Sequence, residues 1–146
     1  MAKVLIVYHS LSGNTRAAAE AVAEGVRAAG GQAIVKEGLK AGEKDLLACD
    51  AIAVGTPDYF SYMAGGVKDF FDRTFYPTQG QVTGKACGIF VTHGGGGKAV
   101  DSCRSICSSF KFKLVGEPVL VQNRPDAAAC ERLKALGRAL VDLAKK

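Results

Sequence analysis

The chain has 146 residues and a formal net charge of +5, with 48% hydrophobic and 23% charged residues. This composition excludes a disordered chain, and the length predicts a single globular domain over residues 1–146. The first apolar run is too short for a signal peptide and no run is long enough to cross a bilayer, so we expect no membrane insertion.

Charge is unevenly distributed along the chain. Residues 1–73 carry 8 basic and 9 acidic side chains, a net charge of −1, whereas residues 74–146 carry 11 and 5, a net charge of +6. A basic second half predicts attraction to an acidic partner or an anionic substrate, and a simply solvated basic face is the alternative. The basic residues are scattered and accompany no recognised binding motif, so we expect no nucleic-acid partner.

The cysteines are five in number: Cys49, Cys87, Cys103, Cys107 and Cys130. An odd number without a C-x-x-C motif predicts free thiols in a reducing cytoplasm, and we expect a cytoplasmic location. Cys103 and Cys107 share one helical face with apolar residues, which predicts that they are buried in the core rather than redox-active or metal-binding. The sequence indicates no metal site.

Apolar strand-like runs alternate with helical patterns along the whole chain. The runs are Lys3–Tyr8, Gln32–Lys36, Ala51–Gly55, Ala86–Thr92 and Leu114–Val121. The helical patterns are Thr15–Ala29, Glu43–Ala48, Met63–Phe75, Lys98–Phe110 and a last helix after Pro125, with Asp126 as its N-cap. This alternation predicts a doubly wound α/β fold, a five-stranded parallel sheet of order 2-1-3-4-5 with helices on both faces. Pro118 inside the fifth run predicts that this strand lies at an edge.

In such a sheet, ligands bind beyond the carboxyl ends of the strands, where the loops after strands one, three and four meet. The first of these loops is Ser10-Leu11-Ser12-Gly13-Asn14-Thr15. A strand, a short loop of hydroxyls and glycine, and a helix start together predict a phosphate site, because unpaired N–H groups and the helix dipole favour an anion there. The alternative is a Ser- or Asn-capped helix start without a ligand.

The second loop contains Pro57, Asp58, Tyr59, Phe60 and Tyr62. Three aromatic residues within four positions indicate a covering role, and an aromatic ring here can stack on a flat ligand. Tyr59 and Phe60 are the candidates to face a ligand. We also expect Phe60 or Tyr62 to pack inward against the core.

The third loop is Thr92-His93-Gly94-Gly95-Gly96-Gly97. Four consecutive glycines are entropically costly to order, so they indicate close approach of the backbone to a planar ligand, with a flexible surface loop as the alternative. His93 is suited to stacking or hydrogen bonding with a ligand, and equally to capping or a solvent-exposed position.

Taken together, these loops resemble those of the flavodoxin-like family, whose cofactor is FMN. Ser10–Thr15 matches the phosphate loop, Gly55–Phe60 with Met63–Gly65 looks like the branch of WrbA-type NAD(P)H:quinone oxidoreductases, and Phe90–Gly97 is similar to the glycine-rich flavin loop. The resemblance implies that residues Ser10, Leu11, Ser12, Gly13, Asn14 and Thr15 bind the FMN phosphate. It also implies that Pro57, Asp58, Tyr59, Phe60, Thr92, His93, Gly94, Gly95 and Gly96 border the isoalloxazine ring.

Two functions remain open at this point, with a binding module that holds no flavin as a third alternative. One is an electron-transfer protein that shuttles electrons between redox partner proteins, acidic ones included; the alternative is an FMN-dependent NAD(P)H:quinone oxidoreductase. The chain is shorter than WrbA-type enzymes and more basic than the usual flavodoxin shuttle, and the lack of a visible nicotinamide site favours the carrier. FMN would carry the redox step, so no residue is assigned a catalytic role. A basic surround predicts a milder reductant than an acidic flavodoxin.

Overall fold

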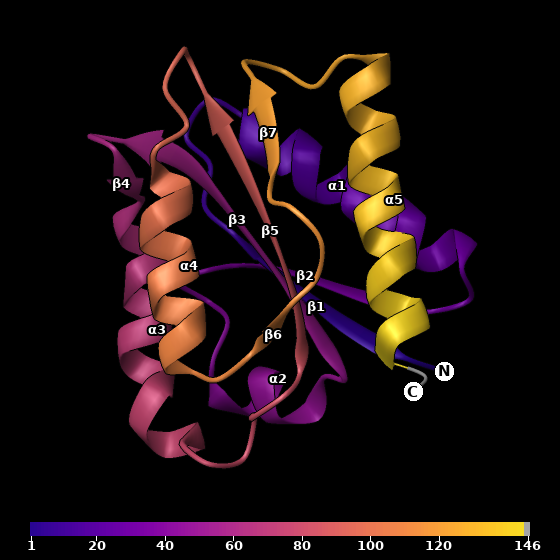
Figure 1. Cartoon of the computed structure of the whole chain (residues 1–146), viewed down its shortest axis with the longest axis vertical. Helices are drawn as coiled ribbons and strands as arrows, with labels where there is room; N and C mark the ends of the chain where they lie inside the picture. Colours follow the sequence, from indigo (N-terminus) through magenta and orange to yellow (C-terminus); the bar gives the residue numbers. More distant parts are fainter. Residues whose placement is uncertain (145–146) are drawn as a thin grey trace.

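The computed structural model describes residues 1–144 and shows a sheet between two layers of helices (Figure 1). Its elements are β1 (Lys3–Tyr8), α1 (Asn14–Ala28), β2 (Gln32–Glu37), α2 (Glu43–Ala48), β3 (Ala51–Tyr59), β4 (Tyr62–Met63), α3 (Gly65–Thr78), β5 (Ala86–His93), α4 (Ala99–Ser109), β6 (Lys113–Leu114), β7 (Val119–Gln122) and α5 (Ala127–Ala144). The sheet order is β2-β1-β3-β5-β6, with β7 also beside β5. The predicted parallel order and doubly wound fold are therefore confirmed.

The sheet is buried on both faces, as its continuous apolar runs predict. Val4 and Ile6 of β1 pack in a core under α1 and α5, whereas Leu5 and Val7 pack in a second core under α2, α3 and α4. Figure 1 shows α1 and α5 on one side of the sheet and α3 and α4 on the other. Side chains alternate across a strand, so a single apolar run supplies both cores.

Helices α1 and α5 approach closely at two glycines. A Cβ atom at Gly25 would collide with the carbonyl oxygen of Lys134, and one at Gly137 would collide with that of Val22. Both glycines are buried in this contact. Backbone therefore packs on backbone here, and this contact fixes the position of α1 and of the loop that precedes it.

The fifth predicted strand is divided into β6 and β7, which corrects the expectation of one continuous run. Cys87 of β5 pairs with Leu114, but Phe90 pairs with Val119, so the outer strand has two more residues than β5 between these pairs. Gly116 has a φ of 62°, which breaks the strand. This strand lies at the edge, as Pro118 predicts.

The third strand is longer than predicted and ends in a hairpin. Strand β3 runs to Tyr59, beyond the expected end at Gly55, because Pro57 still pairs with Thr92 of β5. Tyr59 then pairs antiparallel with Tyr62 of β4. The helix that follows therefore begins at Gly65, not at Met63 as predicted.

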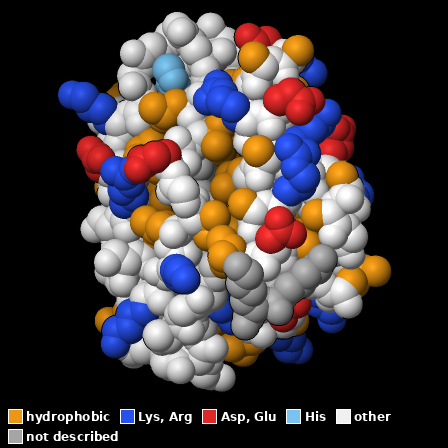
Figure 2. Space-filling model, turned by 45° about the vertical axis from the view of Figure 1, so that its right-hand side comes forward, with side chains coloured by type: hydrophobic (Ala, Val, Ile, Leu, Met, Phe, Trp, Pro, Cys, Tyr) orange, Lys and Arg blue, Asp and Glu red, His pale blue; other side chains and the backbone are white. Residues whose placement is uncertain are grey.

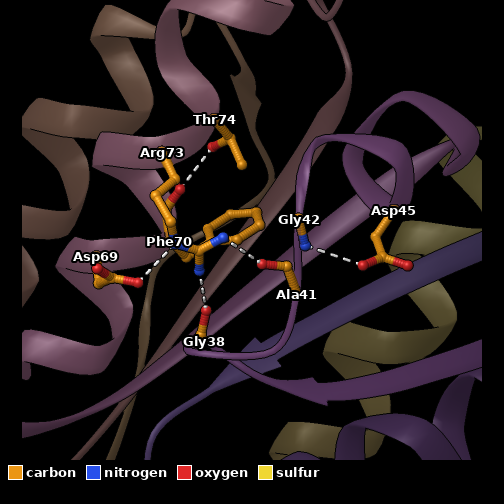
Figure 3. A network of polar contacts seen from close by, with 8 residues as sticks. All are labelled: Gly38, Ala41, Gly42, Asp45, Asp69, Phe70, Arg73 and Thr74. Carbon is orange, nitrogen blue, oxygen red and sulfur yellow. Dashed lines mark hydrogen bonds and ion pairs between the residues drawn. The ribbon is translucent and has the colours of Figure 1, made fainter.

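A salt-bridged arginine ties α3 to the segment between β2 and α2 (Figure 3). The Nε of Arg73 donates to Asp69 Oδ2 at 2.6 Å, and its two terminal nitrogens donate to the carbonyl oxygens of Ala41 at 3.0 Å and Gly38 at 2.7 Å. The guanidinium has a planar fork of donors, so one side chain can bind two backbone carbonyl groups of this segment at once. The contact fixes the chain that leaves the carboxyl end of β2.

Among the cysteines, Cys49, Cys87, Cys103 and Cys107 are buried, which confirms the core prediction for Cys103 and Cys107. Burial raises the pKa of Cys49 to about 11 and that of Cys103 to about 12. These two thiols therefore stay protonated at neutral pH. All five cysteines are free.

The surface carries charges of both signs. In the view of Figure 2, Lys and Arg side chains lie among Asp and Glu side chains, and hydrophobic side chains form a band between them. Within residues 1–144, no helix combines the length and the hydropathy that a membrane span requires.

Candidate cofactor-binding site

A cavity of about 210 Å³ lies where the loops after β1, β3, β5 and β7 meet, at the carboxyl ends of the strands. Its lining residues are Leu11, Ser12, Asn14, Thr15, Pro57, Asp58, Tyr59, Thr92, His93, Gly94 and Asn123. Figure 1 shows the ends of β5 and β7 together at the top of the molecule. All three predicted loops therefore contribute to one cavity, which we call the cofactor cavity.

The first loop leads directly into helix α1. Gly13 has a left-handed backbone, with a φ of 97°, and as the N-cap residue it provides no side-chain cap. Ser10 Oγ accepts a hydrogen bond from the Gly13 N–H at 3.0 Å, and Ser12 Oγ accepts a longer one from the Asn14 N–H at 3.4 Å. These serines hold the loop in shape, and the first turn of α1 remains without an acidic side chain. An anion is the natural complement of such a helix start.

Two hydroxyls join this loop to the third one. Thr15 Oγ1 and Thr92 Oγ1 lie 2.7 Å apart and both residues are buried. Thr15 belongs to the first turn of α1 and Thr92 to the end of β5, and both line the cavity. The hydrogen bond therefore fixes the distance between the helix start and the glycine-rich loop.

The β3–β4 hairpin forms one wall. Thr56 Oγ1 donates to the Pro57 carbonyl oxygen at 2.7 Å and accepts from the Ala64 N–H at 2.8 Å, so a single buried hydroxyl ties β3 to the residue between β4 and α3. Tyr59 lines the cavity, and its ring meets that of His9 edge-on, with centroids 6.1 Å apart. His9 in turn lies against Gly66, where a Cβ atom would be 2.5 Å from its Nδ1.

The expectation that Phe60 or Tyr62 packs inward is wrong. Phe60 is 102% exposed and Tyr62 is 43% exposed. Phe60 and Ser61 form the two-residue turn of the hairpin, and both have positive φ angles, 57° and 62°. This turn directs the Phe60 side chain into solvent rather than toward the core. Phe60 does not line the cavity, and its proposed contact with a ligand stays a prediction.

The glycine-rich loop contributes Thr92, His93 and Gly94, whereas Gly95 and Gly96 do not line the cavity. His93 Nδ1 is buried and has no hydrogen-bond partner among residues 1–144. A buried nitrogen without a partner is costly unless a ligand or water satisfies it. A Cβ atom at Gly96 would lie 3.2 Å from Asp58 Oδ2, which brings the third loop close to the second.

Asn123 is a lining residue that the sequence did not indicate. Its N–H donates to the His93 carbonyl oxygen at 2.8 Å, and its φ of 61° turns the chain away from β7. Gln122 Nε2 also donates, at 3.4 Å, to the Gly94 carbonyl oxygen. The available signal was an Asn directly after the last strand, since Asn tolerates the left-handed conformation and supplies a polar amide.

The lining combines the features that a phosphorylated planar ligand requires. The start of α1 directly follows the loop of Leu11 and Ser12 and has no cap from Gly13, and Pro57, Tyr59 and His93 supply apolar and aromatic surface. Asp58 is the charged residue in the lining. The first loop, Ser10–Thr15, has no charged side chain, which suits a phosphate monoester held by N–H and hydroxyl donors, and the unpartnered His93 nitrogen offers a further polar contact.

Comparison with known proteins agrees with this geometry. A family described as NADPH-dependent FMN reductase matches residues 31–126, two thirds of the chain. The chain belongs to this flavodoxin-like family of FMN proteins. The chain is also 36% identical to a flavodoxin of Aquifex aeolicus, over 80% of this chain and 65% of the relative. An NAD(P)H dehydrogenase (quinone) of Gluconacetobacter diazotrophicus is 42% identical over 51% of this chain and 47% of the relative.

The likeness in structure extends over the whole fold. A flavodoxin from the domain Archaea superimposes with a TM-score of 0.90 at 24% identity, and the match covers 99% of each chain. The two sequence relatives are longer, since the matches span about two thirds and about half of their lengths. The flavodoxin-like family and its FMN cofactor agree with the resemblance that the three loops carry.

Proposed function

We propose that this flavodoxin-like protein holds FMN in the cofactor cavity and carries electrons between redox partner proteins. The observation that supports it most is the convergence of the phosphate-type loop, the β3 end and the glycine-rich loop on one cavity. Each loop alone could serve the fold without a ligand. Together they place an anion site at a helix start beside aromatic and glycine-rich walls, which matches the phosphate and the ring of FMN.

The residues of the first loop would hold the phosphate. The N–H groups at the start of α1 and the hydroxyls of Ser12 and Thr15 are the available donors, and Gly13 allows the backbone to approach. The Ser10 hydroxyl supports the loop from behind through its bond to the Gly13 N–H. Because Thr15 is fixed to Thr92, the phosphate and ring ends of the site keep a constant separation.

Pro57, Tyr59, His93 and Gly94 would border the ring, with Asn123 on the side of β7. The cavity of about 210 Å³ is smaller than the ~300–1,000 Å³ of common small-molecule sites. FMN would therefore extend from the cavity onto its rim, where partners could approach the edge of the flavin ring. When bound, FMN supplies the redox chemistry; the protein supplies orientation, exclusion of water and local charge.

The rim is apolar and exposed. Leu11, which lines the cavity, is 79% exposed, and Phe60, which follows the lining residue Tyr59, is 102% exposed. The net charge of the second half of the chain is +6, from 11 basic and 5 acidic residues. These exposed apolar side chains support partner contact at this rim, and the basic second half of the chain favours acidic partner proteins. Five free thiols agree with a cytoplasmic location.

A second candidate function is the reduction of a quinone by NAD(P)H. It rests on the family described as NADPH-dependent FMN reductase and on the quinone-reducing relative. In this reading, His93 and the exposed rim would face a second substrate instead of a partner protein. The two functions share the cofactor and differ in the number of electrons passed at a time.

Anaerobic stepwise reduction of the FMN-loaded protein, followed by visible absorption, separates the two. A carrier should accumulate one-electron-reduced flavin and oxidise NAD(P)H slowly. Direct two-electron reduction with rapid NAD(P)H oxidation would favour the reductase. If no FMN binds, neither function stands.

A further inference from the structure

A second and larger cavity, of about 500 Å³, lies beside the edge strand β2. Its lining residues are Tyr8, Arg16, Val35, Lys36, Glu37 and Lys40, and we call it the β2-edge cavity. It shares no lining residue with the cofactor cavity. Arg16 lies one position after Thr15 on α1, so the two cavities are neighbours on the same helix start. The volume falls in the range of small-molecule sites.

Tyr8 gives the cavity a polar group on a rigid base. The residue is only 7% exposed and belongs to the core beneath α1, at the end of β1. Its hydroxyl has no hydrogen-bond partner among residues 1–144 and is not fully enclosed by protein, so it opens into the cavity. A tyrosine buried to this extent usually has a partner for its hydroxyl. The hydroxyl is therefore available to a ligand.

The charges of the lining favour an anion. Three cationic side chains line the cavity against a single carboxylate. The guanidinium of Arg16 has no ion-pair or hydrogen-bond partner among the described residues. Lys36 is bound to Asp45 at 2.7 Å, and Lys40 lies 3.5 Å from Glu37. The guanidinium N–H groups of Arg16 are thus free to bind a ligand, and their planar arrangement suits a phosphate group.

Glu37 specifies the ligand further. It is the last residue of β2, the strand next to β1, and 24 positions separate it from Gly13 of the first loop. In nucleotide-binding sheets of parallel strands, an acidic residue at the end of the second strand accepts hydrogen bonds from ribose hydroxyls, and a nearby arginine accommodates a ribose phosphate. Val35 and the Tyr8 ring add apolar surface.

We propose that the β2-edge cavity binds a nucleoside phosphate, with the phosphate on Arg16 and the Tyr8 hydroxyl and a ribose hydroxyl on Glu37. The ligand is either a free nucleotide or the nucleotide half of a dinucleotide, since both present the same chemistry. This site is separate from the cofactor cavity, so it stands or fails independently of FMN binding.

The test is a titration of the ¹⁵N-labelled, FMN-saturated chain with 2′-AMP, with inorganic phosphate and with NADP⁺, followed by NMR and calorimetry. We expect 2′-AMP to shift the amide signals of residues 35–40 and to bind more tightly than phosphate.

R16Q should weaken 2′-AMP binding about tenfold or more, as expected for loss of a charge-assisted contact, and Y8F should weaken it several-fold. R138Q, which removes an exposed arginine on α5, is the matched control and should bind like the parent. Tighter binding of NADP⁺ than of 2′-AMP would identify the dinucleotide, and equal binding would identify the free nucleotide.

Three results would overturn the proposal. The first is no shift at residues 35–40 at millimolar 2′-AMP. The second is a loss of affinity in R16Q no larger than in R138Q. The third is phosphate binding as tightly as 2′-AMP, which would remove the role of Glu37. Should the chain bind no FMN, the same titrations on the FMN-free protein still decide the question.

Discussion

The hydroxyls of Thr15 and Thr92 lie 2.7 Å apart, although 77 residues separate them in the sequence. The two residues are 1% and 3% exposed, so water cannot replace either partner easily. Thr15 sits in the first turn of α1 and Thr92 near the end of β5. One buried hydrogen bond thus joins the proposed phosphate end of the site to its ring end.

Valine at either threonine should lower the free energy of unfolding by about 1–3 kcal/mol, since it leaves a buried hydroxyl unpartnered. The double variant T15V/T92V should cost less than the sum of the single ones, because both polar groups are then removed together. Urea unfolding of the four proteins gives this coupling. Additive losses would show that the two hydroxyls do not depend on each other.

The contact of α1 with α5 should tolerate no side chain at Gly137. A methyl group there meets the Val22 carbonyl oxygen, so G137A should lower the free energy of unfolding by about 1–3 kcal/mol. The control is G65A in the first turn of α3, where an added Cβ atom meets no described residue within 4 Å. In urea unfolding, G65A should be neutral or slightly stabilising; equal losses in both variants would contradict the close approach of the helices.

Asp45 gives the fold a pH-dependent contribution. Burial opposes its ionisation, but the hydrogen bond from Lys36 and that from the Gly42 N–H outweigh this and lower its pKa below the ordinary 3.8 (Figure 3 shows the contact with Gly42). A lowered pKa in the folded state means stabilisation that is present above pH 3.8 and lost as the pH falls through the folded-state pKa.

We therefore expect D45N to lower the free energy of unfolding by about 1 kcal/mol at pH 7, with the partly exposed Lys36 limiting the effect. The difference from the parent should shrink as the pH falls below 3.8. D142N on α5 serves as the control. A difference that stays constant from pH 7 to pH 3 would exclude this account of Asp45.

Asp58 should set the potential of the bound cofactor. Its carboxylate lies in the cavity lining, where it opposes the extra negative charge of reduced flavin. D58N should therefore raise the midpoint potential by an amount equivalent to about 1 kcal/mol, or roughly 40 mV per electron. A reductive titration against a reference dye measures this, with D142N again as the control. An unchanged potential in D58N would show that this carboxylate does not act on the cofactor.

Asp58 also qualifies the expectation, drawn from net charge, of a milder reductant. The chain carries +5 overall, yet the charged residue that lines the cofactor cavity is acidic. Composition cannot show which charges lie next to a ligand, because that depends on the loops that meet in space. The potential of the bound cofactor therefore remains a prediction.

The core elements were predictable because their signals are local. Apolar runs define β1 and β5 to within a residue, and Asp126 caps the last helix as expected, with its Oδ1 accepting from the Ala129 N–H at 2.8 Å. The β3–β4 hairpin was not predicted, since its turn is Phe60-Ser61 rather than the Asn-Gly or Asp-Gly that signals positive φ angles.

Other parts of the site were missed because they depend on tertiary contacts and have no local sequence signal. Asn123 reaches the cofactor cavity because its N–H pairs with the His93 carbonyl oxygen, a contact that sequence spacing does not reveal. The β2-edge cavity likewise needs Arg16 of α1 and Glu37 of β2 to lie together. The first and third loops were found because each is one continuous motif.

The central claim, that the start of α1 holds the phosphate of FMN, is tested most directly by titrating the chain with FMN and with riboflavin. Flavin fluorescence reports both affinities, and the two ligands differ only in the phosphate. Two charge-assisted hydrogen bonds of about 1.5 kcal/mol each predict that FMN binds at least about a hundredfold more tightly than riboflavin, at one molecule per chain. Equal affinity for the two ligands, or no binding of FMN, would contradict the account.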